Sequence, residues 1–507
     1  MGFAYGVDYY PEHWPEERWP LDARMQREAG FNTVRLAEFA WSRLEPAPGR
    51  FNFDWLDRAI EVLAGEGMQV VLGTPTAAPP VWLIEEDRTI LPVDSSGHRV
   101  NFGGRRHYCP THPAFHAATR RIVSAMAEQY ASHPAVVGWQ IDNEFGGNQT
   151  ARCYCDYCRK AFDQWLQDGY GSLDALNRAW GTVFWSQEYS GWHQVPLPLP
   201  PSGIHNPSLE LAYRRFASDA FVAYQQLQLD LLRRLAPRQW ITTNLMRAFT
   251  PLDYARLAQP LDFVAWDNYP RSRRVPGLHP DQVAFTHDLM RGLRGGQGFW
   301  VMEQQSGACG WEIVKSTPRP GEIRLWTYQA VSRGADGIVY FRWRTCRFGA
   351  EEYWHGVLDH DGRPNRRYAE VARTGAELGR LAPLLQATRV HAQVALLRAY
   401  DVLWALEIQP HHPELAYDAL QQAWFNGFFE RGIQTDVISP GADLSRYRVV
   451  VAPALFLADA QLAARLEAFA EAGGTLVLTF RSGVKDPQNV VVDEPLPGVF
   501  ARVCGVE

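Results

Sequence analysis

The feature that most constrains this chain is a regular alternation between short apolar runs and longer amphipathic segments. Each run has the length of a buried strand, and the intervening segments, such as 114–130 and 213–235, repeat apolar residues at helical spacing. Eight alternating β and α units predict a (β/α)8 barrel, with a doubly wound sheet as the alternative. The eight expected strands are 5–10, 33–39, 69–75, 136–144, 240–245, 263–270, 298–305 and 337–343.

Polar side chains stand at the ends of most of these runs. The fourth run ends in Asn143 and Glu144, and the seventh carries Glu303 near its end. In a (β/α)8 barrel the carboxyl ends of all strands meet at one mouth, where the active sites of such barrels lie. The sequence therefore predicts a site of carboxylates, amides, an arginine and aromatic rings at that mouth.

Beyond about residue 385 the alternation starts again. The expected elements are strands 394–397, 449–453 and 475–478 and helices 415–431 and 459–472. They predict a smaller α/β domain with a parallel sheet. We expect a catalytic barrel over 1–385 and a second domain over 386–507, the latter incomplete at its end. Two insertions interrupt the barrel, at 76–112 and, after the fourth strand, at 153–209.

Composition excludes several classes of partner. The 507 residues carry a formal net charge of −6 without a basic stripe, which argues against nucleic acid. No run approaches the ~20 apolar residues of a membrane helix. The start of the chain lacks a secretory signal and the seven cysteines are too sparse for a disulfide framework, so we expect a cytoplasmic protein. The 19 tryptophans suit both core packing and the apolar face of a sugar ring.

Glu144 and Glu303 form the pair with the clearest chemistry. Hydrolysis of a glycosidic bond needs one carboxyl group that protonates the leaving oxygen and another that attacks the sugar or activates water. Strands four and seven face one another across a small barrel, so both tips can flank one bond. Asn143 can hydrogen-bond to the hydroxyl beside the anomeric carbon, whereas Asp142 receives no role. The alternative, a glutamate that only pairs with a loop arginine, weakens when two glutamates occupy facing strands.

Four cysteines form a second constellation. Cys153, Cys155 and Cys158 are clustered, and Cys109 lies in the other insertion. Four thiolates suit a tetrahedral structural zinc with no open coordination position, which would brace loops and take no part in catalysis. Free reduced thiols or a redox pair are the alternatives. No organic cofactor is expected.

Six motifs together resemble the β-galactosidases of glycoside hydrolase family 42. The resemblance extends over essentially the whole chain. The motifs are 6–14 (GVDYYPEHW), 34–41 (VRLAEFAW), 139–144 (WQIDNE), 266–270 (WDNYP), 301–305 (VMEQQ) and 348–356 (FGAEEYWHG).

The resemblance implies a role for each matching residue. Glu144 is implied as the general acid/base and Glu303 as the nucleophile. It also implies a zinc site at Cys109, Cys153, Cys155 and Cys158 and a second domain that contributes to a homotrimer. The residues implied to hold the galactose ring are Arg35, Asn143, Tyr269, Trp311, Glu352 and His355.

Two of these assignments have neighbours that compete with them. Glu351 and Glu352 are adjacent, and Glu352 is preferred because it has a Glu-x-x-His spacing to His355. The alternative to a sugar-binding role for Arg35 is a structural ion pair with Glu38 in the core.

The resemblance implies a retaining enzyme that releases terminal, non-reducing β-D-galactose from galactoside oligosaccharides. That chemistry predicts a raised pKa for Glu144 and an ionised Glu303. Three alternatives remain: an α-L-arabinopyranosidase of the same family, a non-catalytic sugar-binding barrel, and a zinc hydrolase, which would need an open metal site.

Overall fold

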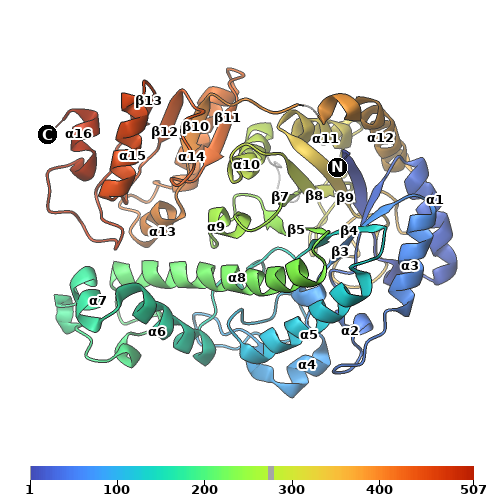
Figure 1. Cartoon of the computed structure of the whole chain (residues 1–507), viewed down its shortest axis with the longest axis horizontal. Coiled ribbons are helices and arrows are strands. Elements are labelled where there is room, and N and C mark those ends of the chain that lie inside the picture. The colour runs from blue at the N-terminus through green and yellow to red at the C-terminus, as the bar shows by residue number, and fades with distance from the viewer. Residues whose placement is uncertain (1, 272–278, 387, 507) are drawn as a thin grey trace.

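The computed structural model describes residues 2–271, 279–386 and 388–506, and its barrel is a single parallel sheet (Figure 1). The strand order is β5-β4-β3-β2-β1-β9-β8-β7-β6. Because β5 and β6 are consecutive pieces of the fifth expected run, the two ends of this order meet and close the barrel. The (β/α)8 prediction is confirmed. The strands are β1 Ala4–Asp8, β2 Thr33–Leu36, β3 Gln69–Gly73, β4 Val136–Gln140, β5 Trp240–Thr242, β6 Asn244–Met246, β7 Val264–Asn268, β8 Phe299–Gln305 and β9 Ala335–Phe341.

Two tryptophans fill the barrel interior below the mouth. Trp240 and Trp300 are buried, with ring centroids 5.2 Å apart. A Cβ on Gly138 would lie 2.1 Å from the Trp240 ring, and one on Gly337 would lie 2.5 Å from Trp300. The two glycines therefore make the room that these indoles need, and the barrel is a packed core.

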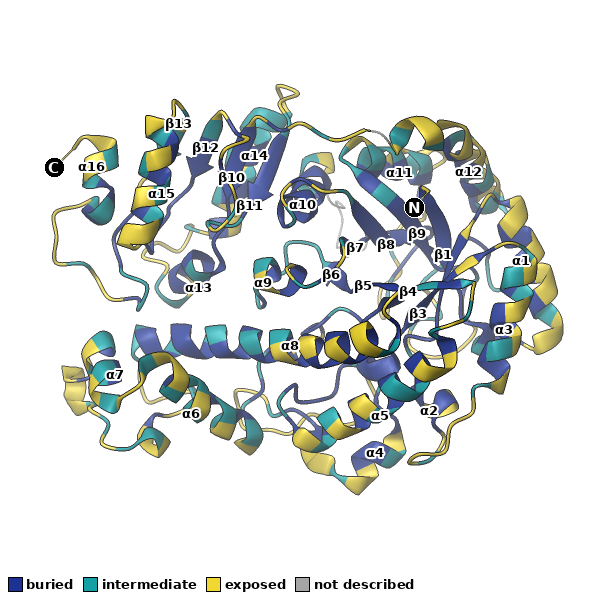
Figure 2. Cartoon of the chain, viewed as in Figure 1, coloured by how far each residue is buried: buried dark blue, intermediate teal, exposed yellow. Residues whose placement is uncertain are grey.

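Amphipathic helices cover the outside of the barrel, with their buried faces toward the strands and their exposed faces outward (Figure 2). This arrangement follows from the helical periodicity of the sequence. The covering helices are α1 Trp19–Glu28, α3 Asp54–Gly65, α5 Pro113–Tyr130, α8 Pro207–Leu235, α9 Tyr254–Ala258, α10 Pro280–Gly292, α11 Glu322–Ser332 and α12 Arg366–Leu385. Among the described residues, none of the helices is both long enough and apolar enough to cross a membrane.

The two insertions add short helices beside the barrel. Their helices are α4 Val81–Glu86 in the first insertion and α6 Asp156–Tyr170 and α7 Leu173–Trp180 in the second, while α2 Trp41–Leu44 follows β2. The 29-residue α8 follows the second insertion and reaches the second domain, where Arg215 pairs with Asp401 at 2.8 Å.

The second domain is a four-stranded parallel sheet in the order β11-β10-β12-β13 (Figure 1). The expected parallel α/β domain is confirmed, but three of its elements, β11, α13 and the short α16, were not predicted. β11 was missed because the buried Asp436, which pairs with Arg291 of α10 at 2.7 Å, interrupts its apolar run. α13 was missed because its own apolar residues occupy all of its faces, so that the sequence shows no separate polar and apolar side. The elements are β10 Val394–Leu397, β11 Thr435–Ile438, β12 Val449–Ala452, β13 Thr475–Leu478, α13 Tyr400–Ile408, α14 Tyr417–Phe429, α15 Ala460–Glu471 and α16 Ala501–Cys504.

Candidate active site

A bulge in β8 turns Glu303 into the barrel mouth. Val301 pairs with Trp266 of β7 and Glu303 pairs with the next residue, Asp267, so that Met302 is an extra residue in the ladder. Side chains of a regular strand alternate between its two faces. Met302 lies in the interior cluster with Trp300, so regular alternation would aim Glu303 outward. The extra residue reverses that alternation, as bulges at barrel rims commonly do.

Three donors hold the Glu303 carboxylate. Arg35 Nη2 donates to Oε1 at 2.7 Å, Asn244 Nδ2 lies 3.3 Å from the same oxygen, and the Tyr269 hydroxyl donates to Oε2 at 2.5 Å. Arg35 also pairs with Glu38 at 3.1 Å, so the expected core ion pair exists beside the contact with Glu303.

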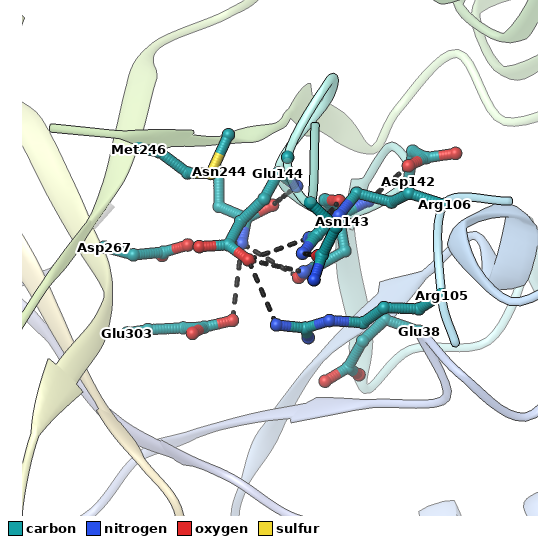
Figure 3. A network of polar contacts seen from close by, with 12 residues as sticks. Glu38, Arg105, Arg106, Asp142, Asn143, Glu144, Asn244, Met246, Asp267 and Glu303 are labelled. Carbon is teal, nitrogen blue, oxygen red and sulfur yellow. Dashed lines mark hydrogen bonds and ion pairs between the residues drawn. The ribbon is translucent and has the colours of Figure 1, made fainter. Parts of the chain in front are cut away.

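Glu144 stands on a tight turn beyond the end of β4. Asp142 and Glu144 both have positive φ, 53° and 51°, a conformation that non-glycine residues seldom adopt. The backbone N–H of Glu144 donates to Asn244 Oδ1 at 3.1 Å. Arg106 Nη1 donates to Glu144 Oε2 at 2.8 Å, and Arg105 Nη2 lies 3.4 Å from the same oxygen (Figure 3).

The structure brings Glu144 and Glu303 together, with Asp267 beside them. One carboxylate oxygen from each of the three lies within 4.8 Å of the other two. Asn244 Nδ2 joins the group by donating to Asp267 Oδ2 at 2.7 Å and to Asn143 Oδ1 at 2.9 Å. Three carboxylates can hold a cation, but the guanidinium groups of arginines already balance the negative charges of both glutamates.

The pKa shifts of Glu144 and Glu303 are opposite to those expected from the sequence. Burial raises the pKa of Glu144, but the nearby Arg106 and Arg105 lower it further than burial raises it. For Glu303, burial together with the charge of Glu144 raises the pKa in spite of Arg35. The difference arises because both arginines come from the first insertion, whose path the sequence did not reveal.

Asp267 lies in a place that favours its protonated form. Burial and the charges of Glu303 and Glu144 raise the pKa of Asp267 well above its usual range. A protonated Asp267 can donate a hydrogen bond to a carboxylate, and such a bond favours the ionised form of its neighbour Glu144.

Asp142, to which the sequence assigned no role, anchors the turn that carries Glu144. Its Oδ2 accepts from the Thr76 hydroxyl at 2.6 Å and from the Tyr108 hydroxyl at 3.0 Å, and its Oδ1 accepts from the backbone N–H of Asn143 at 2.7 Å. Burial raises the pKa of Asp142 to about 6. This carboxyl group ties the end of β4 to both ends of the first insertion.

Tyr269 and Trp311, both predicted to bind sugar, lie on the β7–β9 side of the mouth. Trp354 connects the two, with ring centroids 4.9 Å from Tyr269 and 5.5 Å from Trp311. Trp311 is half exposed, which leaves a flat apolar surface at the rim. The backbone N–H of His355 donates to Ala308 O at 2.7 Å, and this bond holds the loop after β9 against the end of β8.

Of the two adjacent glutamates in that loop, Glu351 has the contacts toward the carboxylate pair. Its carboxylate lies 3.7 Å from Arg105, the residue that also contacts Glu144, and 3.7 Å from Arg342. Glu352 contributes its backbone carbonyl, 2.7 Å from His360 Nε2. The sequence-based preference for Glu352 as a sugar ligand stays a prediction.

The four predicted cysteines lie together, with Sγ atoms within 4.8 Å of one another. All four are buried free thiols, and Cys109 Sγ lies 3.5 Å from Cys155 Sγ and 3.4 Å from Cys158 Sγ. Zinc–sulfur bonds of ~2.3 Å in a tetrahedron place the sulfurs ~3.8 Å apart, so this donor set fits a metal ion of that size.

Sequence reasoning missed Arg105, Arg106 and the role of Asp267. The arginines stand in a long insertion without periodicity. The signal that could have found them is their place four and three residues before Cys109, a predicted metal ligand. Asp267 was visible as a polar strand end in the WDNYP motif, but its contact with both glutamates depends on the barrel geometry.

Comparisons with known proteins agree with this geometry. The sequence model described as beta-galactosidase, glycoside hydrolase family 42, matches residues 8–381, and the beta-galactosidase trimerisation domain matches residues 392–507. Beta-galactosidase Bga of Halorubrum lacusprofundi is 44% identical over 99% of this chain and 73% of its own length. A beta-galactosidase of Thermus thermophilus is 45% identical over 97% of this chain and 77% of its own length.

Solved structures give the same result. The polyextremophilic beta-galactosidase from Halorubrum lacusprofundi superposes with a TM-score of 0.95 at 44% identity, covering 99% of this chain and 76% of that one. The beta-galactosidase from the psychrophilic Marinomonas ef1 gives a TM-score of 0.95 at 36% identity, covering 99% and 79%. The resemblance seen in the sequence motifs is thereby confirmed, and the chain belongs to the beta-galactosidase family, glycoside hydrolase family 42.

Proposed function

We propose that this protein is a retaining β-galactosidase that releases terminal, non-reducing β-D-galactose from galactoside oligosaccharides. The observation that carries the proposal is the approach of Glu144 and Glu303 to within 4.8 Å across the mouth of the barrel. Retaining glycosidases hold their two carboxyl groups ~5 Å apart, whereas inverting enzymes leave room for a water between them.

In the first step a Glu303 oxygen attacks the anomeric carbon while Glu144 gives its proton to the glycosidic oxygen. The bond from that carbon to the leaving oxygen breaks, and the leaving group departs as an alcohol. In the second step Glu144 takes a proton from water, the water oxygen attacks the same carbon, and the bond to Glu303 breaks. Galactose leaves with its anomeric configuration retained.

The donors around Glu303 serve the first step. Arg35, Tyr269 and Asn244 each donate toward its carboxylate, which aligns one oxygen and stabilises the charge that the attack consumes. Asn143, whose Oδ1 accepts from Asn244, is positioned to bind the hydroxyl beside the anomeric carbon. Trp311, Glu352 and His355 would complete the galactose site on the other side of the barrel mouth from Asn143.

The four-cysteine group is proposed to hold a structural Zn²⁺ through Cys109, Cys153, Cys155 and Cys158. Zinc with four thiolates supplies cross-linking of loops and no catalytic chemistry. The cluster joins the two insertions, and Cys109 directly follows Tyr108, which donates to Asp142. The metal would thus stabilise the loop that surrounds Glu144.

We further propose that residues 1–385 form the catalytic unit and residues 386–507 a domain for homotrimer formation. The match of the trimerisation domain to 392–507 supports this division. The seven free thiols support a reducing, cytoplasmic location.

The function is tested by replacing the nucleophile. Glu303→Gln keeps the size and the hydrogen-bonding capacity of the side chain but removes the attacking oxygen anion. Hydrolysis of p-nitrophenyl β-D-galactoside should fall about 10⁵-fold with an unchanged circular dichroism spectrum. Near-native activity in this variant would sink the assignment.

The same assay separates the neighbouring sugar specificity. The α-L-arabinopyranoside lacks only the hydroxymethyl group of galactose, so matched nitrophenyl glycosides compare the two directly. If kcat/KM is higher for the arabinopyranoside, the preferred sugar is arabinose and not galactose. If neither glycoside is turned over, the protein is a sugar-binding protein without catalytic activity.

A further inference from the structure

Asp267 of β7 points into the barrel mouth. Its neighbour Trp266 packs outward against α10, where the indole and the His287 ring lie 5.0 Å apart, and successive side chains of a strand face opposite ways. Asp267 is only 2% exposed. Its Oδ2 accepts from Asn244 Nδ2 at 2.7 Å, but its buried Oδ1 receives no hydrogen bond from a donor group of any described residue. A buried carboxylate oxygen without a donor is costly, so this oxygen favours a proton of its own.

The carboxyl groups of Asp267 and Glu144 are hydrogen-bonded to one another, and Figure 3 shows them end to end. Asn244 fixes their separation, because its Oδ1 accepts from the backbone N–H of Glu144 at 3.1 Å while its Nδ2 holds Asp267. An ionised carboxylate has acceptors only, so a hydrogen bond between two carboxyl groups contains a proton. The pair therefore binds one proton, and this geometry allows either residue to carry it.

The charges around Asp267 favour retention of that proton. Arg35 pairs with Glu303 at 2.7 Å and Arg106 pairs with Glu144 at 2.8 Å, so these two cations compensate the glutamates. Burial and the charges of Glu303 and Glu144 raise the pKa of Asp267. The titratable groups that face Asp267 are Asp8 of β1, Arg35 of β2, Glu144 after β4, Tyr254 of α9, Tyr269 after β7 and Glu303 of β8.

Glu144 needs such a proton nearby if it is to act as an acid. A general acid must carry a proton when it meets the leaving oxygen, but Arg106 and Arg105 lower the pKa of Glu144. A proton that is held on the adjacent carboxyl group is available to Glu144 even though its own pKa is low.

We propose that Asp267 is the positioning residue of Glu144 and shares one proton with it. Before the glycosidic bond breaks, the proton passes from Asp267 Oδ1 to a carboxylate oxygen of Glu144, which gives it to the leaving oxygen. Asp267 is then a carboxylate. In the second step Glu144 takes a proton from water and passes it back to Asp267. One proton leaves with the alcohol and one enters from water, so the cycle is balanced.

The charge of the site stays constant through this cycle. In the reactive state Glu144 and Glu303 are ionised and Asp267 is neutral. In the galactosyl-enzyme Glu303 is an uncharged ester, while Glu144 and Asp267 are ionised. Both states have two carboxylate charges for the same arginines to balance. The inference rests on the proposed β-galactosidase function and adds a third carboxyl group to its proton transfer.

The test replaces Asp267 by asparagine in the full-length protein. In Asp267→Asn the amide keeps the size of the side chain, accepts from Asn244 and donates to Glu144, but it cannot give up a proton. On methyl β-D-galactoside, whose leaving group needs a proton, kcat/KM should fall about 30-fold, less than loss of the acid itself costs. On 2,4-dinitrophenyl β-D-galactoside, whose leaving group needs none, kcat/KM should stay within about threefold of the wild type.

The pH profile gives a readout that a purely structural role would not move. At high pH an ionised Asp267 adds a negative charge to the cluster, and that charge holds the last proton of the cluster more tightly. Asp267→Asn removes the charge, so the alkaline limb of kcat/KM on methyl galactoside should move to lower pH by about one unit.

Asp253→Asn is the matched control. Burial raises the pKa of Asp253 to about 6, but this residue caps α9, a role that asparagine can also fill. Its profile and rates should equal those of the wild type.

The other outcomes overturn the inference. Wild-type rates and an unmoved profile in Asp267→Asn would leave Asp267 a permanently neutral donor. Equal losses on both galactosides with a lower melting temperature would indicate a disturbed site in place of a shared proton. Asp267→Ser, which cannot ionise either, takes its place if the asparagine variant does not fold. If the wild type hydrolyses neither galactoside, the proposed function itself falls. If it hydrolyses both and the variant matches it, only the shared proton falls.

Discussion

Glu303 and Glu144 face each other across the barrel mouth, but they are held in different ways. Glu303 belongs to a seven-residue strand, and its donors Arg35, Asn244 and Tyr269 all come from or directly follow barrel strands. Glu144 stands on a turn with positive φ, and its two arginine partners come from an insertion. The barrel alone positions the proposed nucleophile, whereas the acid/base depends on loops.

The largest effect that separates the two residues should come from Glu144→Ala. Loss of a general acid slows departure of a poor leaving group by about 10³-fold but affects an activated one far less. We therefore expect a steep dependence of kcat/KM on leaving-group pKa, where the wild type shows a shallow one. Added azide should restore turnover by acting on the galactosyl-enzyme without base assistance. The absence of both signatures would contradict the acid/base role.

Disrupting the cysteine cluster should damage the Glu144 half of the site more than the Glu303 half. Cys155→Ser is expected to lose the bound zinc, lower the melting temperature and reduce kcat about tenfold through looser loops. Metal content, thermal unfolding and rate are measured together, with the exposed Cys504→Ser as the matched control.

Covalent labelling of Glu303 by a fluorogalactoside should remain possible in the same Cys155→Ser protein. Brief dialysis of the folded wild type against a chelator should leave its activity intact, because the metal is not a reactant. Immediate loss of activity without unfolding would favour a zinc hydrolase.

Asp142→Ala tests whether the turn needs its anchor. The change leaves the buried hydroxyls of Thr76 and Tyr108 without their acceptor, which should cost about 2–4 kcal/mol of unfolding free energy. The rate should fall by less than in Glu144→Ala, by about fivefold, and the dependence on leaving group should steepen. Asp230→Ala, an exposed carboxylate on α8, serves as the control. A stability loss without any change in leaving-group dependence would limit Asp142 to a purely structural role.

The smallest predicted effect is a shift of the pH profile. Tyr269 and Arg106 lower the pKa of Glu303 and Glu144, respectively, so Tyr269→Phe and Arg106→Met should each raise the pKa of their partner. Glu303 must be ionised to attack and Glu144 protonated to donate. In the free protein the pKa of Glu144 is lowered and that of Glu303 is raised, so the acid limb of kcat/KM follows Glu144 and the alkaline limb follows Glu303. Arg106→Met should therefore move the acid limb to higher pH, and Tyr269→Phe the alkaline limb, each by about one unit or less.

Because the two carboxyl groups titrate as a pair, each limb of that profile reports the pair as a whole. The comparison between the two variants is therefore more informative than either value. Identical shifts of both limbs in both variants would show that the tyrosine and the arginine do not act on separate glutamates.

The sequence by itself determined the barrel, the second parallel domain and the identity of the main chemical groups. Periodicity of three to four residues marks a helix and apolar runs mark buried strands, and both signals are local. The polar strand ends singled out Glu144 and Glu303, since the topology of a (β/α)8 barrel brings strand tips to one mouth. The four cysteines were singled out by their spacing within the two insertions.

Only the tertiary structure decided how those groups are tuned. The bulge at Met302 that turns Glu303 inward depends on the register of β8 against both neighbours. The pairing of Arg105 and Arg106 with Glu144 depends on the path of a loop that has no periodic pattern. Electrostatic shifts and loop positions are set by distances between residues far apart in the chain, and such distances exist only once the barrel has closed.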